Sequence, residues 1–260
     1  MRIVIKVGTA TLYQNEKLSN RIDNLVEFLV ELNKTNEVIL VSSGAVGAGY
    51  TKLKLDKTKI ENKQALASIG QPLLMKEYKL RFDKYNQIVS QVLLTAADFD
   101  SRKRTMNAKN MIEVLLDNKV IPIINENDAV SIDEIVFGDN DQLSAYTAYY
   151  FDADMLVILS DIEGLYDSNP KENKNAKLLK VVTQIDKNLM NTPCNPNDKF
   201  ATGGIVTKLK AAEFLMKKNK QMFLASGFDL SDVKSFLIDK IHKKGTLFKW
   251  HLNLMKIKVK

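Results

Sequence analysis

Short apolar runs rich in β-branched residues alternate along this chain with longer segments of helical periodicity. Most of the runs are almost continuously apolar, which is typical of strands covered on both faces of a sheet. They are RIVIKV (2–7), EVILVS (37–42), QIVSQVLL (87–94), VIPII (120–124), MLVILS (155–160) and QMFLAS (221–226). This alternation predicts an α/β fold, a three-layer α/β/α sandwich with a mainly parallel central sheet.

Apolar residues at helical spacing predict the helices that cover this sheet. Between the first two runs, Leu25, Leu29 and Leu32 recur at helical spacing, and Ser19 precedes them as a candidate N-cap. Further helices are predicted over residues 61–83, 97–117, 140–151 and 203–219. The segment IDEIVF (132–137) is an exception, which we interpret as half of a hairpin at the rim.

Length and composition indicate one folded domain. The chain has 260 residues, of which 45% are hydrophobic, and the least regular stretch, 165–203, is a candidate flap instead of a linker. We therefore expect one domain over residues 1–250 and a short basic tail over 251–260. A single cysteine, Cys194, excludes an internal disulfide framework, and two histidines offer little for a metal site. No apolar run approaches the ~20 residues that span a bilayer, so we expect a cytoplasmic protein without membrane contact.

The charge is compatible with two kinds of partner. A net charge of +7 suits nucleic acid, but also anionic small molecules such as nucleotides. The basic residues are scattered, and the clusters at 102–104 and 243–244 are short and not interleaved with aromatic residues. We interpret both clusters as solvated surface and expect no nucleic-acid partner.

Glycine-rich and polar clusters follow the predicted strands, where ligands gather in open α/β sheets. The clusters are Lys6-Val7-Gly8-Thr9, Ser42-Ser43-Gly44 with Gly47 and Gly49, Ser160-Asp161, and Thr202-Gly203-Gly204 ahead of Lys208. They match neither the P-loop nor the dinucleotide fingerprint, yet glycine next to a helix start lets backbone N–H groups approach a phosphate. Tight turns, small residues for packing and a capped helix start remain the structural alternatives.

Two further features place polar or charged side chains where they need an interaction partner. Lys6 lies within an apolar strand, where a cation needs either a ligand or a salt bridge to a neighbouring strand end. The run 125–144, NENDAVSIDEIVFGDNDQLS, gathers short carboxylates and amides around one glycine. Such residues form turns and helix caps as readily as they bind ligands.

These stretches together resemble the glutamate 5-kinases of the amino acid kinase family. The matching segments, in the order of that family, are VIKVGT, VSSGAVGAG, NENDAV, GDNDQLSA, LSDIEGLY, TGGIVTKLKAA and GTLF, and they span residues 1 to about 250. The resemblance implies transfer of a phosphoryl group from ATP to the γ-carboxylate of L-glutamate, the first step of proline biosynthesis. It also implies a homo-oligomer, with proline as a feedback inhibitor.

The resemblance assigns a role to each matching residue. Catalysis is expected from Lys6, Lys208, Gly8, Gly44 and Asp141, with Asp141 holding the two lysines. Glutamate is expected at Ser43, Asp128 and Asn140, where Asp128 accepts from the α-ammonium and the other two donate to carboxylates. ATP is expected at Lys6, Ser160, Asp161, Thr202, Gly203, Gly204 and Lys208, with Mg²⁺ carried on its phosphates and no fixed protein ligand.

Three features depart from the family pattern. Many members carry a C-terminal PUA domain, which we do not expect here. Position 160 is Ser where better-known members have Thr, and Pro193-Cys194-Asn195-Pro196 replaces a glycine-rich stretch. We expect catalysis to survive all three.

Other functions stay open at this point. Acetylglutamate kinase, aspartokinase, UMP kinase and carbamate kinase share the superfamily, but NENDAV followed by GDND favours the free-glutamate enzyme because a free ammonium needs a carboxylate such as Asp128. A degenerate kinase that senses amino acids and an RNA-binding protein are alternatives of another class.

Overall fold

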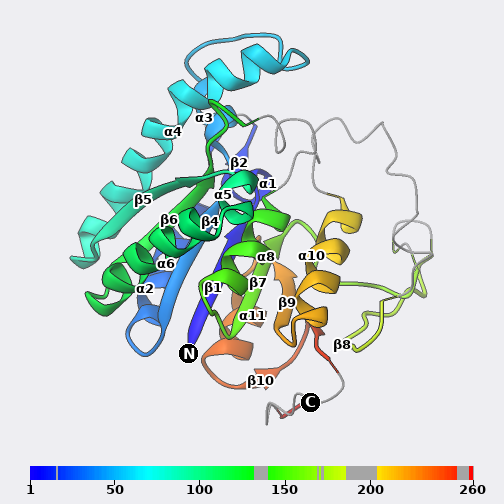
Figure 1. Ribbon diagram of the computed structural model, residues 1–260. Helices are drawn as coiled ribbons and strands as arrows, with labels where there is room; N and C mark the ends of the chain where they lie inside the picture. The colour runs from blue at the N-terminus through cyan, green and yellow to red at the C-terminus, as the bar shows by residue number, and fades with distance from the viewer. Residues whose placement is uncertain are drawn as a thin grey trace.

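Eight strands form one central sheet in the residues that the computed structural model describes, namely 1–15, 17–131, 140–168, 170, 173–185, 204–250 and 258–259 (Figure 1). In sheet order they are β5 (Val89–Leu94), β6 (Ile121–Glu126), β4 (Glu37–Ser42), β1 (Arg2–Val7), β7 (Met155–Ser160), β9 (Gln221–Ser226), β11 (Thr246–Phe248) and β8 (Val181–Val182). Neighbours from β5 to β9 are parallel, whereas β9 and β11 are antiparallel. The strands from β5 to β9 therefore share one carboxyl edge.

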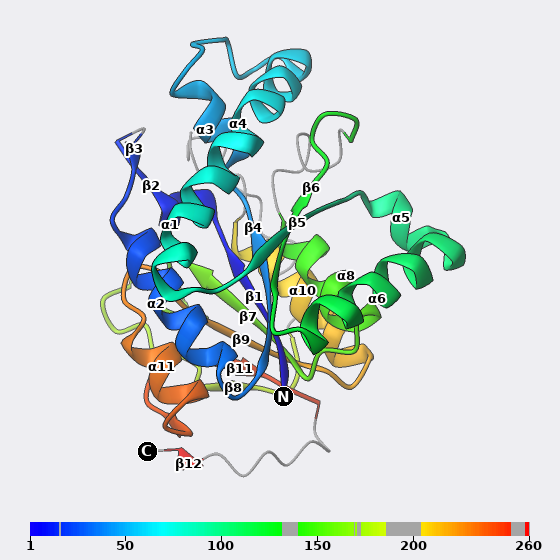
Figure 2. The ribbon, with the colours of Figure 1, turned by 90° about the vertical axis from the view of Figure 1, so that its left-hand side faces the viewer.

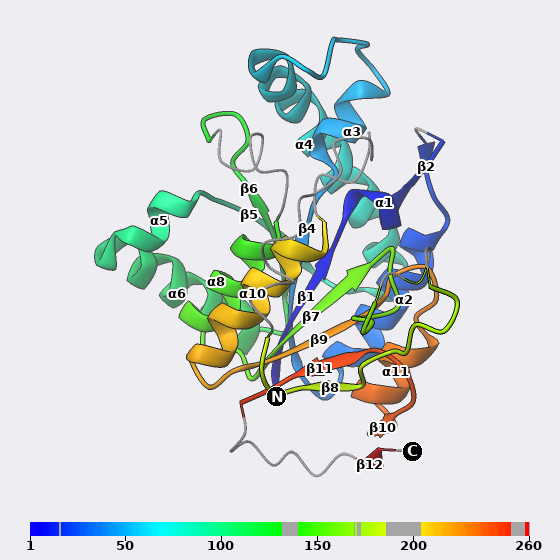
Figure 3. The same ribbon diagram turned by 90° about the vertical axis from the view of Figure 1, so that its right-hand side faces the viewer.

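Helices cover both faces of the sheet, as Figures 2 and 3 show. One layer contains α2 (Arg21–Asn33), α4 (Ile60–Phe82) and α11 (Ser231–Leu237), and the other contains α6 (Arg102–Asp117), α8 (Asp141–Tyr150) and α10 (Ile205–Lys217). Shorter helices are α1 (Thr9–Leu12), α3 (Ala45–Tyr50), α5 (Ala96–Asp100) and the 3₁₀ turn η1 (Asp83–Tyr85). The predicted three-layer α/β/α sandwich is confirmed.

The central strand β1 serves both layers by alternation of its side chains. Ile3 and Ile5 belong to the core cluster that includes residues of α2, α4 and α11. Val4 belongs to the opposite cluster, with residues of α6, α8 and α10. Two positions after Val4, the side chain of Lys6 therefore points toward α8 and α10.

Helices α3 and α4 cross without space for side chains at the crossing. A Cβ atom at Gly49 would lie 1.9 Å from the carbonyl oxygen of Leu66. One at Gly70 would lie 1.7 Å from the carbonyl oxygen of Ala45. Part of the predicted glycine-rich loop therefore serves packing, as the structural alternative proposed.

The strands agree closely with the sequence, but one helix does not. The runs 2–7, 37–42, 155–160 and 221–226 coincide with strands, whereas β5 begins at Val89 and β6 extends to Glu126. The single helix predicted over 97–117 is wrong. Ser101 is extended, with φ −103° and ψ 107°, and its hydroxyl accepts a hydrogen bond from the Arg104 amide, so α6 starts afresh after α5. Ser19 also caps differently, since α2 begins at Arg21, whose amide donates to the Ser19 hydroxyl.

Several short elements were not predicted. A hairpin joins β2 (Tyr13–Gln14) to β3 (Lys17–Leu18), and β10 (Ile241–His242) pairs in parallel with β12 (Lys258–Val259). The segment IDEIVF, most of the tail over 251–260 and much of the flap over 165–203 lie outside the described residues. Within the described residues, no helix is both long and apolar enough to cross a membrane.

Candidate active site

Three charged side chains meet in the interior near the carboxyl edge of the sheet. Lys6 of β1 and Lys208 of α10 are only 4% and 5% exposed, and Asp141, the first residue of α8, is fully buried. The Lys6 ammonium lies 2.7 Å from Asp141 Oδ1, and the Lys208 ammonium lies 3.1 Å from Asp141 Oδ2. One carboxylate thus lies between two cations and is shared by them.

The start of α10 is tied to the same carboxylate. The Thr207 hydroxyl lies 3.0 Å from Asp141 Oδ2 and 2.8 Å from the carbonyl oxygen of Gly204. Gly204 is the N-cap of α10. Thr207 lies within the stretch 202–208 predicted for the nucleotide but was not named individually, although its place directly before Lys208 in TGGIVTKLK was a usable signal. Thr202 and Gly203 lie outside the described residues.

Two predicted glycines line this region. A Cβ atom at Gly8 would lie 3.7 Å from the Lys6 ammonium, so Gly8 leaves space on that side of the lysine. Gly44 has a φ of +114°, which disfavours any side chain, and it caps α3 directly after Ser43. The turn after β4 therefore requires glycine at position 44 for a conformational reason as well.

Ser43 and Asn140 contact each other, as their common assignment requires. The side-chain amide of Asn140 donates to the Ser43 hydroxyl at 2.9 Å and to Asn125 Oδ1 at 2.8 Å. Both hydrogens of that amide are engaged by protein groups here, and donation from Asn140 to a substrate carboxylate stays a prediction. Asn125 was quoted in the Asn/Asp run but given no role.

Asp128 lies just beyond β6 with an unusual charge state. It is 8% exposed, and burial, together with the negative charge of Glu126, raises its pKa to about 7. The neighbouring Asn127 forms a turn, because its carbonyl oxygen accepts from the amides of Val130 and Ser131. Turn formation and a buried carboxylate therefore coexist in the same run.

The other side of β1 contains Ser160 and Asp161. The Ser160 hydroxyl donates to Asp161 Oδ1 at 2.9 Å, and the Ser160 carbonyl accepts from the Gly227 amide at the end of β9. Asp161 is exposed. These residues lie at the same carboxyl edge as Lys6, separated from it by one strand spacing.

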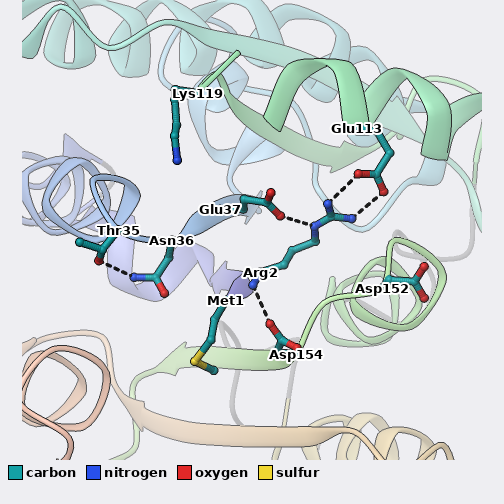
Figure 4. Close-up of a pocket in the computed structure, with 9 residues that line it drawn as sticks. All are labelled: Met1, Arg2, Thr35, Asn36, Glu37, Glu113, Lys119, Asp152 and Asp154. Carbon is teal, nitrogen blue, oxygen red and sulfur yellow. Dashed lines mark hydrogen bonds and ion pairs between the residues drawn. The ribbon is translucent and has the colours of Figure 1, made fainter. Parts of the chain in front are cut away.

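An open hollow of about 570 Å³ lies at the opposite, amino edge of the sheet (Figure 4). Arg2 fills its centre, bonded to Glu37 at 2.8 Å and to both oxygens of Glu113 at 2.7 Å. Hydrogen bonding to Glu113 raises the pKa of Arg2, and the backbone amide of Arg2 donates to Asp154. The guanidinium of Arg2 is already paired with Glu37 and Glu113, and these bonds stabilise the start of β1. The hollow is not the predicted active site.

Among the residues that the structure describes, no group of three or more His, Cys, Asp or Glu side chains is arranged to hold a metal ion. Mg²⁺ carried on the ATP phosphates stays a prediction.

This fold is that of a family of kinases. The model of the amino acid kinase family matches residues 1–226, so the chain belongs to that family. The structure also superposes on the crystal structure of UMP kinase from Ureaplasma parvum with a TM-score of 0.64 at 17% identity, covering 95% of this chain and 98% of that one.

Within the family, the chain is similar to glutamate 5-kinases. The protein of that name from Wolinella succinogenes is 55% identical, over 95% of this chain and 97% of that protein. The one from Leishmania donovani is 52% identical, over 95% of this chain and 94% of that protein.

Proposed function

We propose that this protein phosphorylates the γ-carboxylate of L-glutamate with ATP, giving L-glutamyl 5-phosphate and ADP, the first step of proline biosynthesis. The glutamate 5-kinases to which the chain is similar support the substrate. The observation that carries the chemistry is the buried Lys6–Asp141–Lys208 arrangement.

The reaction needs charge neutralisation more than proton transfer. A glutamate γ-carboxylate has an unperturbed pKa of about 4.3 and is already a nucleophile at neutral pH, so no general base is required. The obstacle is the approach of a carboxylate to a triphosphate, negative toward negative. Two lysines held at a fixed separation by one carboxylate are suited to lower that barrier for a direct in-line transfer.

Each side chain then has a distinct task. Lys6 and Lys208 stabilise charge on the transferred phosphoryl group and on the bridging oxygen. Asp141 acts as an organiser of both lysines and not as a base. The backbone N–H groups of Gly8 and Gly44 bind the equatorial oxygens.

Glutamate binds on the other side of the lysines. Ionised Asp128 pairs with the α-ammonium, and Ser43 and Asn140 lie beside the backbone of the substrate. The burial of Asp128 supports this pairing. Burial raises the pKa of its carboxyl group, and a cationic ligand stabilises the ionised form that burial disfavours.

ATP binds at the edge formed by Ser160, Asp161 and Gly204, the N-cap of α10. Thr202 and Gly203 of the same TGG motif are further predicted contacts. Mg²⁺, when bound to the nucleotide, neutralises phosphate charge. Proline as an inhibitor, a homo-oligomeric assembly and a cytoplasmic location remain predictions from the family resemblance.

The decisive experiment traps the acyl phosphate. The pure protein is incubated with Mg-ATP and hydroxylamine, and γ-glutamyl hydroxamate and ADP are measured with L-glutamate, L-aspartate, N-acetylglutamate or UMP. Hydroxamate from glutamate alone supports the proposal, and added proline then tests feedback. ADP formed only with another acceptor would overturn the glutamate assignment, and binding of ATP without turnover on any acceptor would indicate an amino acid sensor.

A further inference from the structure

A chain of hydrogen-bonded side chains connects the outer strand β5 to the first turn of α8. Gln71 of α4 donates to Gln91 Oε1 of β5 at 3.3 Å and accepts from Asn125 Nδ2 of β6 at 2.9 Å. Asn125 Oδ1 accepts from Asn140 at 2.8 Å, and Asn140 also donates to Ser43. Gln71, Asn125 and Asn140 are all buried, with exposures of 9%, 2% and 0%.

One backbone group identifies the direction of the bonds in this chain. A carboxamide can present either its oxygen or its NH₂ group to a neighbour. The backbone amide of Glu126 donates to Asn125 at 2.9 Å, and because a backbone N–H only donates, the atom of Asn125 that receives it is oxygen. Asn140, which shares that oxygen, must therefore present its NH₂ group to Asn125.

This direction leaves one acceptor unused. With both hydrogens of its amide engaged, Asn140 retains Oδ1, which is buried and has no hydrogen-bond partner in the described part of the chain. A buried acceptor without a donor is unfavourable, so the site favours a ligand that brings one. In glutamate at neutral pH, the α-ammonium is the only donor, since both carboxylates only accept.

Gln71 provides the second support for this direction. Gln71 Oε1 accepts a hydrogen bond from Asn125 Nδ2. If the Asn125 amide rotated by half a turn, its oxygen would face the oxygen of Gln71, and its NH₂ group would face the N–H of Glu126. Among the described residues that bond to the Asn125 side chain, the Glu126 amide is the one that still opposes that rotation without Gln71. A rotated Asn125 would turn Asn140 as well, and the NH₂ group of Asn140 would then face the ammonium.

We propose that Gln71, although it does not touch the substrate, is a positioning residue that sets the preference of this site for an α-amino group by keeping Asn140 Oδ1 as an acceptor. The inference rests on the proposed glutamate kinase function and deepens it. It extends the amino acid site to a helix that contributes no charged group to it.

The test compares glutamate with glutarate, which has the same reacting carboxylate but no amino group. Replacing Gln71 by Met removes the acceptor at similar length, and we expect the ratio of kcat/KM for glutamate to kcat/KM for glutarate to fall about ten- to hundredfold. Glutarate is measured as a competitive inhibitor where its turnover is too slow. The KM for ATP should not change.

Two variants separate this effect from general damage. Gln71→Glu keeps an oxygen for Asn125 Nδ2 and should restore the ratio, because Gln91 at the exposed edge can turn to donate. Gln64→Met makes the same substitution two turns earlier on α4 and should leave the ratio unchanged. If Gln71→Met does not fold, Gln71→Ala has the same expected effect with a good helix former.

The outcomes are distinct. A parallel loss for glutamate and glutarate, or an unchanged ratio, in a Gln71 variant of an active enzyme would overturn the role of Gln71. A wild-type protein that makes no hydroxamate from glutamate would instead overturn the proposed function.

Discussion

The Lys6 ammonium and the Asp141 carboxylate lie 2.7 Å apart, and the two side chains are almost completely withdrawn from solvent. They come from the central strand and from the first position of α8, which lies within the run 125–144. Asp141 also pairs with Lys208, so one carboxylate contacts both cations.

Removal of either lysine should abolish most turnover. We expect Lys6→Ala and Lys208→Ala to lower kcat by about 10²–10³ or more, the scale for losing one preorganised electrostatic group. Steady-state ADP release measures the effect. Lys210→Ala, at an exposed position of the same helix, is the control and should retain wild-type kcat. A lysine variant with normal turnover would contradict the charge-neutralisation mechanism.

Neutralising Asp141 should lower both the stability and the activity of the protein. Asp141→Asn leaves two buried ammonium groups without their shared carboxylate, which we expect to lower the free energy of unfolding by about 3–5 kcal/mol. Urea denaturation measures the stability, and kcat is measured below the transition. Unchanged stability would mean that the lysines are held by groups other than Asp141.

The affinity for glutamate should depend on pH through Asp128. Burial raises its pKa to about 7, so below that pH the carboxyl group is neutral and cannot pair with the α-ammonium. The KM for glutamate should therefore fall as the pH rises from 6 to 8 and then level off. In Asp128→Asn, KM should be higher and nearly independent of pH.

Stability provides an independent check on the same group. The folded state retains a proton on Asp128 that the unfolded chain releases near pH 3.8, so the free energy of unfolding without substrate should decrease as the pH rises toward 7. Asp128→Asn should remove this contribution. Identical pH slopes in both proteins would show that Asp128 is not perturbed.

The crossing of α3 and α4 should tolerate no added methyl group. In Gly70→Ala the new Cβ would overlap the Ala45 carbonyl oxygen, and we expect the free energy of unfolding to fall by about 3 kcal/mol or more. Gly47→Ala is the matched control, since its Cβ would have ordinary contacts of 3.6 Å to Thr9. That control should be neutral or more stable by up to about 1 kcal/mol. Thermal unfolding of both variants decides the comparison.

The clamp around Arg2 should matter for stability alone. Arg2→Met loses the bonds to Glu37, Glu113 and the Phe151 carbonyl, and we expect a loss of about 1–3 kcal/mol, moderated by the partial exposure of both carboxylates. At temperatures where the variant is folded, kcat should be normal because the clamp lies at the opposite edge. Lys119→Met, in the same hollow, should change neither property.

The sequence predicted the sheet well because its central strands are buried on both faces. Nearly continuous apolar runs such as 2–7 and 155–160 have the length of strands and are rich in Ile, Val and Leu, which favours buried strands over helices. The break between α5 and α6 was missed because Ser101 is compatible with either a helix or a cap until its neighbours are in place. Short strands such as β8 and β10 have too few residues for a periodic pattern.

The contacts between charged side chains of the site were predictable from the sequence, whereas the hydrogen bonds between its side-chain amides were not. The pairing of Asp141 with Lys6 and Lys208 was expected, and the structure brings the three together, while their catalytic roles stay predictions. The direction of the Asn140 amide depends on the Glu126 backbone and on Gln71, which is distant in sequence. No local pattern at position 71 distinguishes it from any glutamine on the inner face of a helix.

The antiparallel pairing of β11 with β9 limits the length of the carboxyl edge on which the predicted site residues lie. From β5 to β9 the carboxyl ends span five strand spacings, or ~24 Å at about 4.8 Å each. Along that edge, β4 and β6 lead to Ser43 and Asp128 on one side of β1, and β7 leads to Ser160 on the other. We therefore expect the kinetic effect of a substitution to depend on which strand it follows along this edge. Substitutions on the β4 side should alter saturation by the amino acid, those on the β7 side saturation by the nucleotide, and those at β1 itself the rate of transfer.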